Sequence, residues 1–122
     1  MRMDRAMLFV KDMGTMMAFY RDVVGFRPVG TTAGNDWIEF DAGGTIFALH
    51  AVPAHMAGAI SISSPSVARQ SQNCKLIFTA DDLDEERARL EAAGVTILPR
   101  QWGGWDAVDP EGNVFGVRAA NA

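Results

Sequence analysis

The chain has 122 residues, of which 48% are apolar and 21% are charged, and its formal net charge at pH 7 is −4. This length allows one compact domain, and the acidic balance argues against a nucleic-acid partner, because phosphate binding depends on clustered Lys and Arg. No segment is long and apolar enough to cross a bilayer, and the single cysteine, Cys74, cannot form an intrachain disulfide. The start of the chain shows no signal-peptide pattern. We therefore expect a cytoplasmic protein with no membrane partner.

The first half of the chain predicts a strand, a helix and three further strands. Residues 5–11 are apolar and rich in strand-forming types. Asp12 then offers an N-cap for a helix over 13–24, whose apolar side chains recur at i, i+3 and i+4. The three strands that follow the helix are expected near residues 26–31, 36–41 and 45–52. Residues 53–73 contain two Pro and many Ser and Ala, show little periodicity and are typical of a linker.

The second half predicts the same order of elements. Residues 75–80 indicate a strand, and Asp82 offers an N-cap for a helix over 83–93. This helix opens with acidic residues, which are favourable at the positive end of the helix dipole, and Gly94 supplies its C-cap. The strands that follow are expected near residues 95–100, 105–109 and 113–118.

A sequence repeat relates the two halves. Residues 41–49 and 109–117 both read D-x-x-G-x-(I/V)-F-(A/G)-(L/V), 68 residues apart, and Trp37 and Trp105 stand at the same offset. The Asp-x-x-Gly segments predict hairpin turns, because Gly accepts a positive φ. We therefore predict an α+β fold of two tandem βαβββ modules within a single domain over 1–122. Module 1 spans residues 1–52, the linker 53–73 and module 2 residues 74–119.

The alternation of side chains along the predicted strands sorts them into two faces. One face is uniformly apolar, and we expect the helices to cover it. The other face mixes aromatic with charged side chains, as is typical of a surface that lines a ligand cavity. Its members are Arg5, Met7, Phe9, Trp37, Glu39, Ala48, His50, Lys75, Ile77, Trp105, Gly116 and Arg118.

The string V-x-D, helix, F-Y-R-D-V-V-G-F over residues 10–26, together with D-P-E-G-N at 109–113, resembles the vicinal oxygen chelate superfamily. This superfamily contains glyoxalases, bleomycin-resistance proteins and extradiol dioxygenases. The resemblance implies a curled mixed sheet, an open barrel with helices on its convex side. It also implies a homodimer with two cavities, each shared between the chains. It does not select one activity, because members include isomerases, dioxygenases, thiol transferases and proteins that only sequester a drug.

The resemblance also implies a metal site, with one ligand from the first and one from the last strand of each module, and this chain departs from it. The positions that are usually His correspond to Arg5 and Lys75. The positions that are usually Glu correspond to Ala48 and Gly116. None of these side chains is a usual ligand for a divalent ion. We therefore expect no metal at these four positions and no cofactor.

The aromatic side chains of the mixed face have two interpretations. Trp37 and Trp105 either pack at a dimer contact or the barrel rim, or they stack on a planar ligand. Trp102, in the Gly-rich loop 101–105, is either a lid or a surface aromatic. Cys74 next to Lys75 has no catalytic arrangement of His and acid in the sequence, so we interpret it as structural.

The charged side chains of the mixed face also leave alternatives open. Arg5, Lys75 and Arg118 are either solvated strand ends or, because they share one face at duplicated positions, a cluster that binds an anion. His50 is either a hydrogen-bonding side chain or a catalyst, since an imidazole group suits both roles. Together with Glu39 it supplies too few ligands for a shifted metal site.

Two classes of function remain. The first is a metal-free binding protein that holds a planar, anionic small molecule, similar to the drug-sequestering members. The second is a lyase, isomerase or dioxygenase of the same superfamily with an atypical site. This enzyme is either metal-dependent through an unusual site or metal-free, with His50 as the general base and Arg5 or Lys75 stabilising an enolate-like charge. The sequence names neither ligand nor substrate. The predicted ligand-binding residues are Arg5, Phe9, Trp37, His50, Lys75, Trp105 and Arg118.

Overall fold

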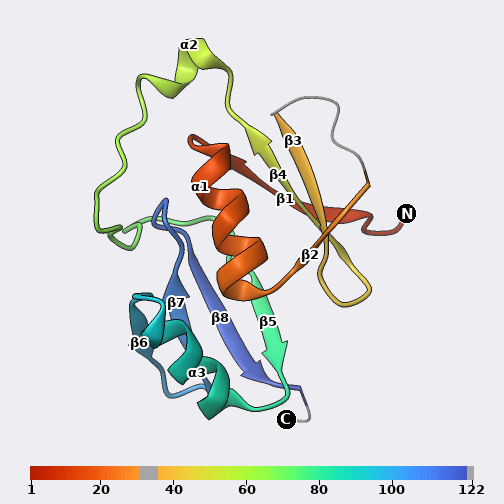
Figure 1. The fold of residues 1–122 in the computed structure, drawn as a ribbon, viewed down its shortest axis with the longest axis vertical. Coiled ribbons are helices and arrows are strands. Elements are labelled where there is room, and N and C mark those ends of the chain that lie inside the picture. The colour runs from red at the N-terminus through yellow and green to blue at the C-terminus, as the bar shows by residue number, and fades with distance from the viewer. Residues whose placement is uncertain (31–35, 121–122) are drawn as a thin grey trace. The chain divides into compact units, whose positions relative to one another are not determined.

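The computed structural model describes residues 1–30 and 36–120 (Figure 1). The chain divides into two compact units, Met1–Ser61 and Ile62–Ala122. Their boundary falls within the predicted linker. Each unit holds one four-stranded mixed sheet and its own helices. In the part of the chain that the model describes, no helix is long and apolar enough to span a membrane.

Unit 1 begins with a strand and a helix and continues with three strands (Figure 1). Its sheet has the order β1-β4-β3-β2, in which β1 runs parallel to β4 and the other neighbours are antiparallel. The helix of this unit has a π-helical second half, labelled η1. The elements are β1 (Arg5–Val10), α1 (Met13–Ala18), η1 (Phe19–Val24), β2 (Arg27–Val29), β3 (Trp37–Asp41), β4 (Ile46–Ala51) and α2 (Ala54–Ala57).

Unit 2 repeats this arrangement, with the sheet order β5-β8-β7-β6 and a parallel pair formed by β5 and β8. The predicted α+β fold of two βαβββ modules is therefore confirmed. The strands pair as two separate four-stranded sheets, which are not closed into a barrel. The elements of unit 2 are β5 (Ile77–Ala80), α3 (Leu83–Ala92), β6 (Ile97–Pro99), β7 (Gly104–Val108) and β8 (Val114–Ala119).

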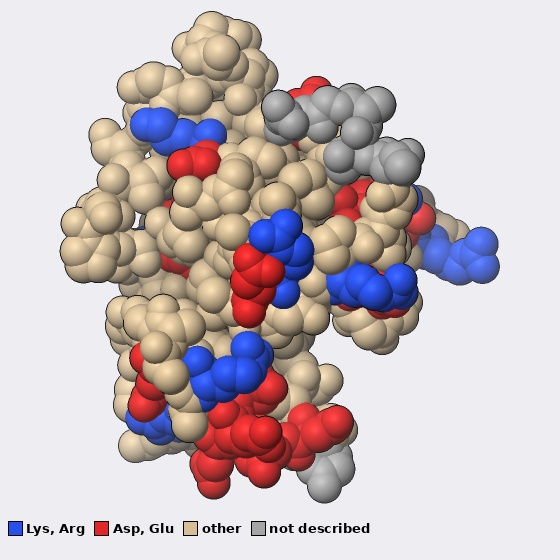
Figure 2. Space-filling model, in the orientation of Figure 1, with Lys and Arg blue, Asp and Glu red and all other residues tan. Residues whose placement is uncertain are grey.

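Aspartate side chains begin both main helices, as the sequence predicts. The Thr15 amide donates to Asp12 Oδ1 at 3.1 Å, and the Glu85 amide donates to Asp82 Oδ1 at 3.0 Å. In unit 2 the first turn of α3 adds three carboxylates over residues 84–86, and Figure 2 shows acidic side chains gathered around this end of the helix. Each contact satisfies amides that have no partner within the helix.

Replacing Asp12 with Ala should lower the free energy of unfolding by about 1 kcal/mol at pH 7, because the first turn of α1 loses its cap. The hydrogen bond from the Thr15 amide lowers the pKa of Asp12 below its ordinary value. A lowered pKa contributes stability that is present above the unfolded value and is lost as the pH falls. Urea denaturation should therefore show a smaller difference at pH about 3, and Asp12→Asn should keep most of the cap. Equal stability of Asp12→Ala and wild type at pH 7 would contradict this account.

An aromatic cluster fills one side of the sheet in unit 1. The ring of Tyr20, from η1, lies 4.8 Å from the ring of Phe47, centroid to centroid, and Phe26 lies 5.9 Å from Phe47. Phe40 and Leu49 on the same face are fully buried. Because directly opposite residues share a face, the pairs Phe40–Phe47 and Ile38–Leu49 define the first face of this sheet, which packs against the helix.

Candidate functional site

The other side of each sheet, which we call the second face, carries the charged side chains. In unit 1, Met7 and Glu39 lie on either side of Ala48 in neighbouring strands. In unit 2, Ile77 and Asp106 lie on either side of Gly116. We define the second face of unit 1 by Arg5, Met7, Phe9, Trp37, Glu39, Ala48 and His50, and that of unit 2 by Lys75, Ile77, Gly104, Asp106, Gly116 and Arg118.

The register of the hairpin on this face differs by one residue between the two units. Trp37 lies opposite His50 in unit 1, whereas the matching partner of Arg118 in unit 2 is Gly104 and not Trp105. The hairpin loop is one residue longer in unit 2, with residues 109–113 between the strands in place of 42–45. A slip of one residue moves every side chain of a strand to the other face. Asp106 therefore matches Glu39.

The expected position of Trp105 on the mixed face is wrong for this reason. Trp105 lies directly opposite Val117 and is only 5% exposed. Val117 and Phe115 are buried as well, and Ala107 lies opposite Phe115. Trp105 is therefore a core residue of the first face of unit 2.

An ion pair and an aromatic row occupy the second face of unit 1. Arg5 donates to the carboxylate of Glu39 and also to Asp4. The hydrogen bond to Asp4 is the main cause that raises the pKa of Arg5, and the charge of Glu39 adds to it. The ring of His50 lies between Phe9 and Trp37, with centroid distances of 5.6 and 5.4 Å. Phe9 is largely exposed, so this row has an apolar surface open to a ligand.

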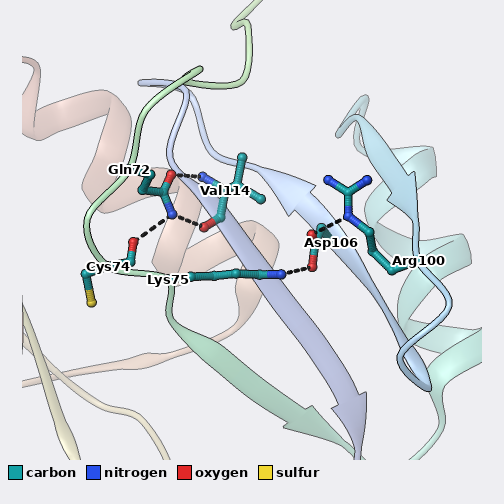
Figure 3. A network of polar contacts seen from close by, with 6 residues as sticks. All are labelled: Gln72, Cys74, Lys75, Arg100, Asp106 and Val114. Atoms are coloured by element: carbon teal, nitrogen blue, oxygen red, sulfur yellow. Dashed lines mark hydrogen bonds and ion pairs between the residues drawn. The ribbon is translucent and has the colours of Figure 1, made fainter.

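The second face of unit 2 contains a buried carboxylate between two cations. Asp106 is 1% exposed. Lys75 Nζ lies 2.6 Å from Asp106 Oδ1, and Arg100 Nε donates to Asp106 Oδ2 at 2.7 Å. The two cations approach from opposite sides (Figure 3). The lysine contact is an ion pair at short distance without hydrogen-bond geometry. Two charge partners offset the cost of burying this carboxylate.

A glutamine side chain holds the segment that leads to Lys75. Gln72 Nε2 donates to the carbonyls of Val114 and Cys74, both at 2.7 Å, and Gln72 Oε1 accepts from the Val114 amide at 2.9 Å (Figure 3). The Gly116 amide then donates to the Leu76 carbonyl at 2.8 Å. The side-chain amide thus replaces strand pairing beside β8, and β5 begins at Ile77 and not at residue 75. Cys74 contributes its carbonyl, and its thiol is exposed.

The indole of Trp102 lies over two glycines of the second face of unit 2. A Cβ on Gly104 would stand 2.8 Å from Trp102 Cη2, and a Cβ on Gly116 would stand 3.0 Å from Trp102 Cζ2. Lys75 Nζ lies 5.2 Å from the centroid of the indole. This distance is within the range of a cation–π interaction.

These residues do not fit the metal site that the resemblance implies. A Cβ at Gly116 would also lie 3.2 Å from Asp106 Oδ1 and 3.3 Å from Lys75 Cε. A ligating side chain at Gly116 therefore has no room unless its neighbours move. Arg5 and Lys75 are cations, and Ala48 has no donor atom. Among the described residues, no three His, Cys, Asp or Glu side chains gather as a group that could hold a metal ion.

The structure brings most of the predicted site residues onto the second faces and adds others. Arg118 lies on β8 two residues beyond Gly116, and its side chain is exposed. Sequence reasoning missed Arg100 and Asp106. A charged residue within the predicted strand 105–109 was the available signal for Asp106, because an unpaired carboxylate is rare in a buried strand.

The geometry of the site does not assign the chain to a protein family, but a family model does. The model described as Glyoxalase/Bleomycin resistance protein/Dioxygenase superfamily matches residues 2–117. The chain belongs to this superfamily. The match spans both units, and it agrees with the resemblance that the sequence motifs indicate. No curated protein sequence matches this superfamily member.

Solved structures share the fold of this superfamily member. TnmS3, an antibiotic binding protein from Streptomyces sp. CB03234, is 24% identical, covers 98% of this chain and 95% of its own, and has a TM-score of 0.66. Lactoylglutathione lyase from Agrobacterium tumefaciens is 23% identical, with 98% and 93% covered and a TM-score of 0.67. The fosfomycin resistance protein FosX from Listeria monocytogenes is 15% identical, with 97% and 90% covered and a TM-score of 0.73. At these identities the likeness shows the fold alone.

Proposed function

We propose that this chain is a metal-free small-molecule-binding protein whose ligand is planar and anionic, and that it sequesters this ligand as bleomycin-resistance proteins do. The observation that carries the proposal is that each second face has an ion-paired cation together with an aromatic side chain, which belongs to the face in unit 1 and reaches it from the loop at Trp102 in unit 2. Among similar structures, TnmS3 is an antibiotic binding protein, which supports binding as a role for this fold.

The charge of the second face favours an anion in unit 2. Lys75, Arg100 and Arg118 are cations, whereas Asp106 is the carboxylate placed between two of them. The side chains of Lys75 and Arg100 remain 36% and 45% exposed, so a ligand can reach them. Each charge-assisted hydrogen bond to an acid contributes roughly 1.5–3 kcal/mol. Stacking on an indole adds about 1 kcal/mol and favours a planar body.

Lys75→Met should weaken the binding of planar acids by about tenfold or more, which corresponds to roughly 1.4 kcal/mol. The amides of the same acids should lose little affinity, because they carry no charge for the ammonium group to recognise. Isothermal titration with naphthoate and naphthamide, on wild type and variant, measures both effects. Equal losses for the acid and its amide would refute the proposed role of the charge.

A second candidate is a lyase, isomerase or dioxygenase that uses His50 as a general base. The position of His50 between two aromatic rings on the second face favours this candidate, and Glu39 lies on the same face. One similar structure is a lactoylglutathione lyase. Conversion of a bound acid that is abolished by His50→Gln, with binding retained, would favour catalysis over sequestration.

The assembly, the metal content and the location stay predictions. We propose a cytoplasmic homodimer that binds no stoichiometric metal at Arg5, Ala48, Lys75 and Gly116. Light scattering of the purified protein tests the first point, and a monomer mass at micromolar concentrations would refute it. Elemental analysis of protein purified without chelator tests the second, and about one transition metal per chain would refute it.

A further inference from the structure

Trp102 occupies the place on the second face of unit 2 that the sequence repeat assigns to Trp105. The shift of β7 turns Trp105 into the first face and leaves Gly104 at the position of Trp37. The indole of Trp102 lies against this glycine and Gly116, and the missing Cβ atoms make room for it. Both units thus present an indole on the second face, from a strand in unit 1 and from a loop in unit 2.

Lys75 lies beside this indole, and Arg100 shares its carboxylate partner. Lys75 Nζ stands 5.2 Å from the ring centroid and 2.6 Å from the buried Asp106. Arg100 contacts Asp106 through Nε, and its two terminal nitrogens point away from the carboxylate (Figure 3). Trp102 itself is 41% exposed. The indole and both cationic heads are therefore fixed on one side by buried groups and accessible on the other.

We propose that Trp102, Lys75 and Arg100 form a binding site for a planar aromatic carboxylate within unit 2. The aromatic body stacks on the indole, and the carboxylate contacts the ammonium group and the terminal nitrogens of the guanidinium group. Asp106 is a positioning residue that holds both cations from the buried side of the site. This inference rests on the proposed function and deepens it, since it assigns the acid to unit 2 and adds two residues, Trp102 and Arg100.

The three tryptophans allow the site to be located directly. Protein labelled with nitrogen isotope at tryptophan gives one indole N–H resonance for each ring, and Trp102→Phe assigns the relevant one. Titration with naphthoate should shift the Trp102 resonance most and leave that of Trp105 nearly unchanged. A shift confined to Trp37 would overturn this inference while the proposed function stands. No shift and no heat of binding with any planar acid would overturn both.

Two further variants separate stacking from obstruction by the indole. Trp102→Ala should weaken naphthoate binding by roughly two- to twelvefold, because stacking of this kind is worth roughly 0.5–1.5 kcal/mol. Gly116→Ala should also weaken it, since the added methyl crowds the indole, Asp106 Oδ1 and Lys75 Cε while every charged group is retained. Met56→Ala, which truncates an exposed side chain of α2, is the control and should bind as wild type. Thermal melting confirms that each variant is folded. Tighter binding by Trp102→Ala would show that the indole blocks the face, and would overturn the proposal.

Discussion

Removing both cations around Asp106 should destabilise the protein by about 3 kcal/mol, because the change leaves a carboxylate buried without a charge partner. The variant is Lys75→Met with Arg100→Met, which keeps most of the apolar length of each side chain. Each single variant should cost clearly less than half of this amount, since one cation still faces the carboxylate in each. Such non-additivity is expected for groups that share one partner. Urea denaturation at pH 7 measures the three free energies of unfolding.

Two comparisons isolate the buried charge as the cause. Adding Asp106→Leu to the double variant should restore most of the lost stability, because an apolar replacement of a buried ionic cluster is often neutral. The matched control is Arg87→Met with Arg89→Met, which removes two arginines of α3 whose carboxylate partners are 49% and 35% exposed. That control should lose less than about 1 kcal/mol. A double variant at Lys75 and Arg100 that is no less stable than this control would contradict the account.

Gly112→Ala should destabilise the protein by roughly 2–5 kcal/mol, the sum of backbone strain and a steric collision. Gly112 has a φ of +86°, and strain at such an angle costs about 1–2 kcal/mol. The added Cβ would also stand 2.4 Å from the Val67 carbonyl oxygen, and forced repacking typically costs a further 1–3 kcal/mol or so. The Arg69 amide, which donates to the Gly112 carbonyl at 2.9 Å, would be displaced as well.

The repeat supplies a matched control for this collision. Gly44 stands at the same place of the D-x-x-G pattern and has a φ of +99°, but a Cβ on it would meet nothing within 4 Å. Gly44→Ala therefore measures the strain alone. Denaturant unfolding of both variants should show a clearly larger loss for Gly112→Ala. Equal losses would mean that the segment around Val67 does not pack on this turn.

The sequence predicted the parts of the fold that depend on local signals. Asp12 and Asp82 were expected as N-caps, and both accept the expected amide. In unit 1 the alternation along the strands placed Trp37, Glu39 and His50 on one face, which the strand pairing confirms. In this unit the alternation of side chains agrees with the register of the hairpin, so the alternation alone was sufficient to assign each side chain to a face.

The same alternation assigned the side chains of β7 to the wrong faces, because the register of a hairpin depends on the length of its turn. The repeat aligns Asp41 with Asp109 without a gap, yet Asp41 still pairs with Ile46, whereas Asp109 lies in the loop. Asp109 Oδ1 accepts from the amides of Glu111 and Asn113, both at 2.9 Å, and so organises a longer turn. The ladder therefore ends at Val108. The side chains of both aspartates accept amides of their own turns, so an alignment of the sequences cannot show which aspartate also continues the strand pairing.

The other residues of the site depend on the tertiary fold in further ways. Asp106 joins the second face only after the shift, and Arg100 and Trp102 reach it from a loop whose path no periodicity predicts. Gln72 belongs to the predicted linker, and its amide positions the segment before Lys75 through contacts that depend on the tertiary fold.

The most direct test of the proposed binding activity is a calorimetric titration of the wild-type protein with three ligands of one shape and different charge. The ligands are naphthoate, naphthamide and the corresponding naphthylmethylammonium cation, at one ionic strength, because exposed charges are screened by salt. The acid should bind at least about tenfold more tightly than the amide, and the cation should bind most weakly. Equal affinity for the acid and the amide, or tightest binding of the cation, would contradict the proposal.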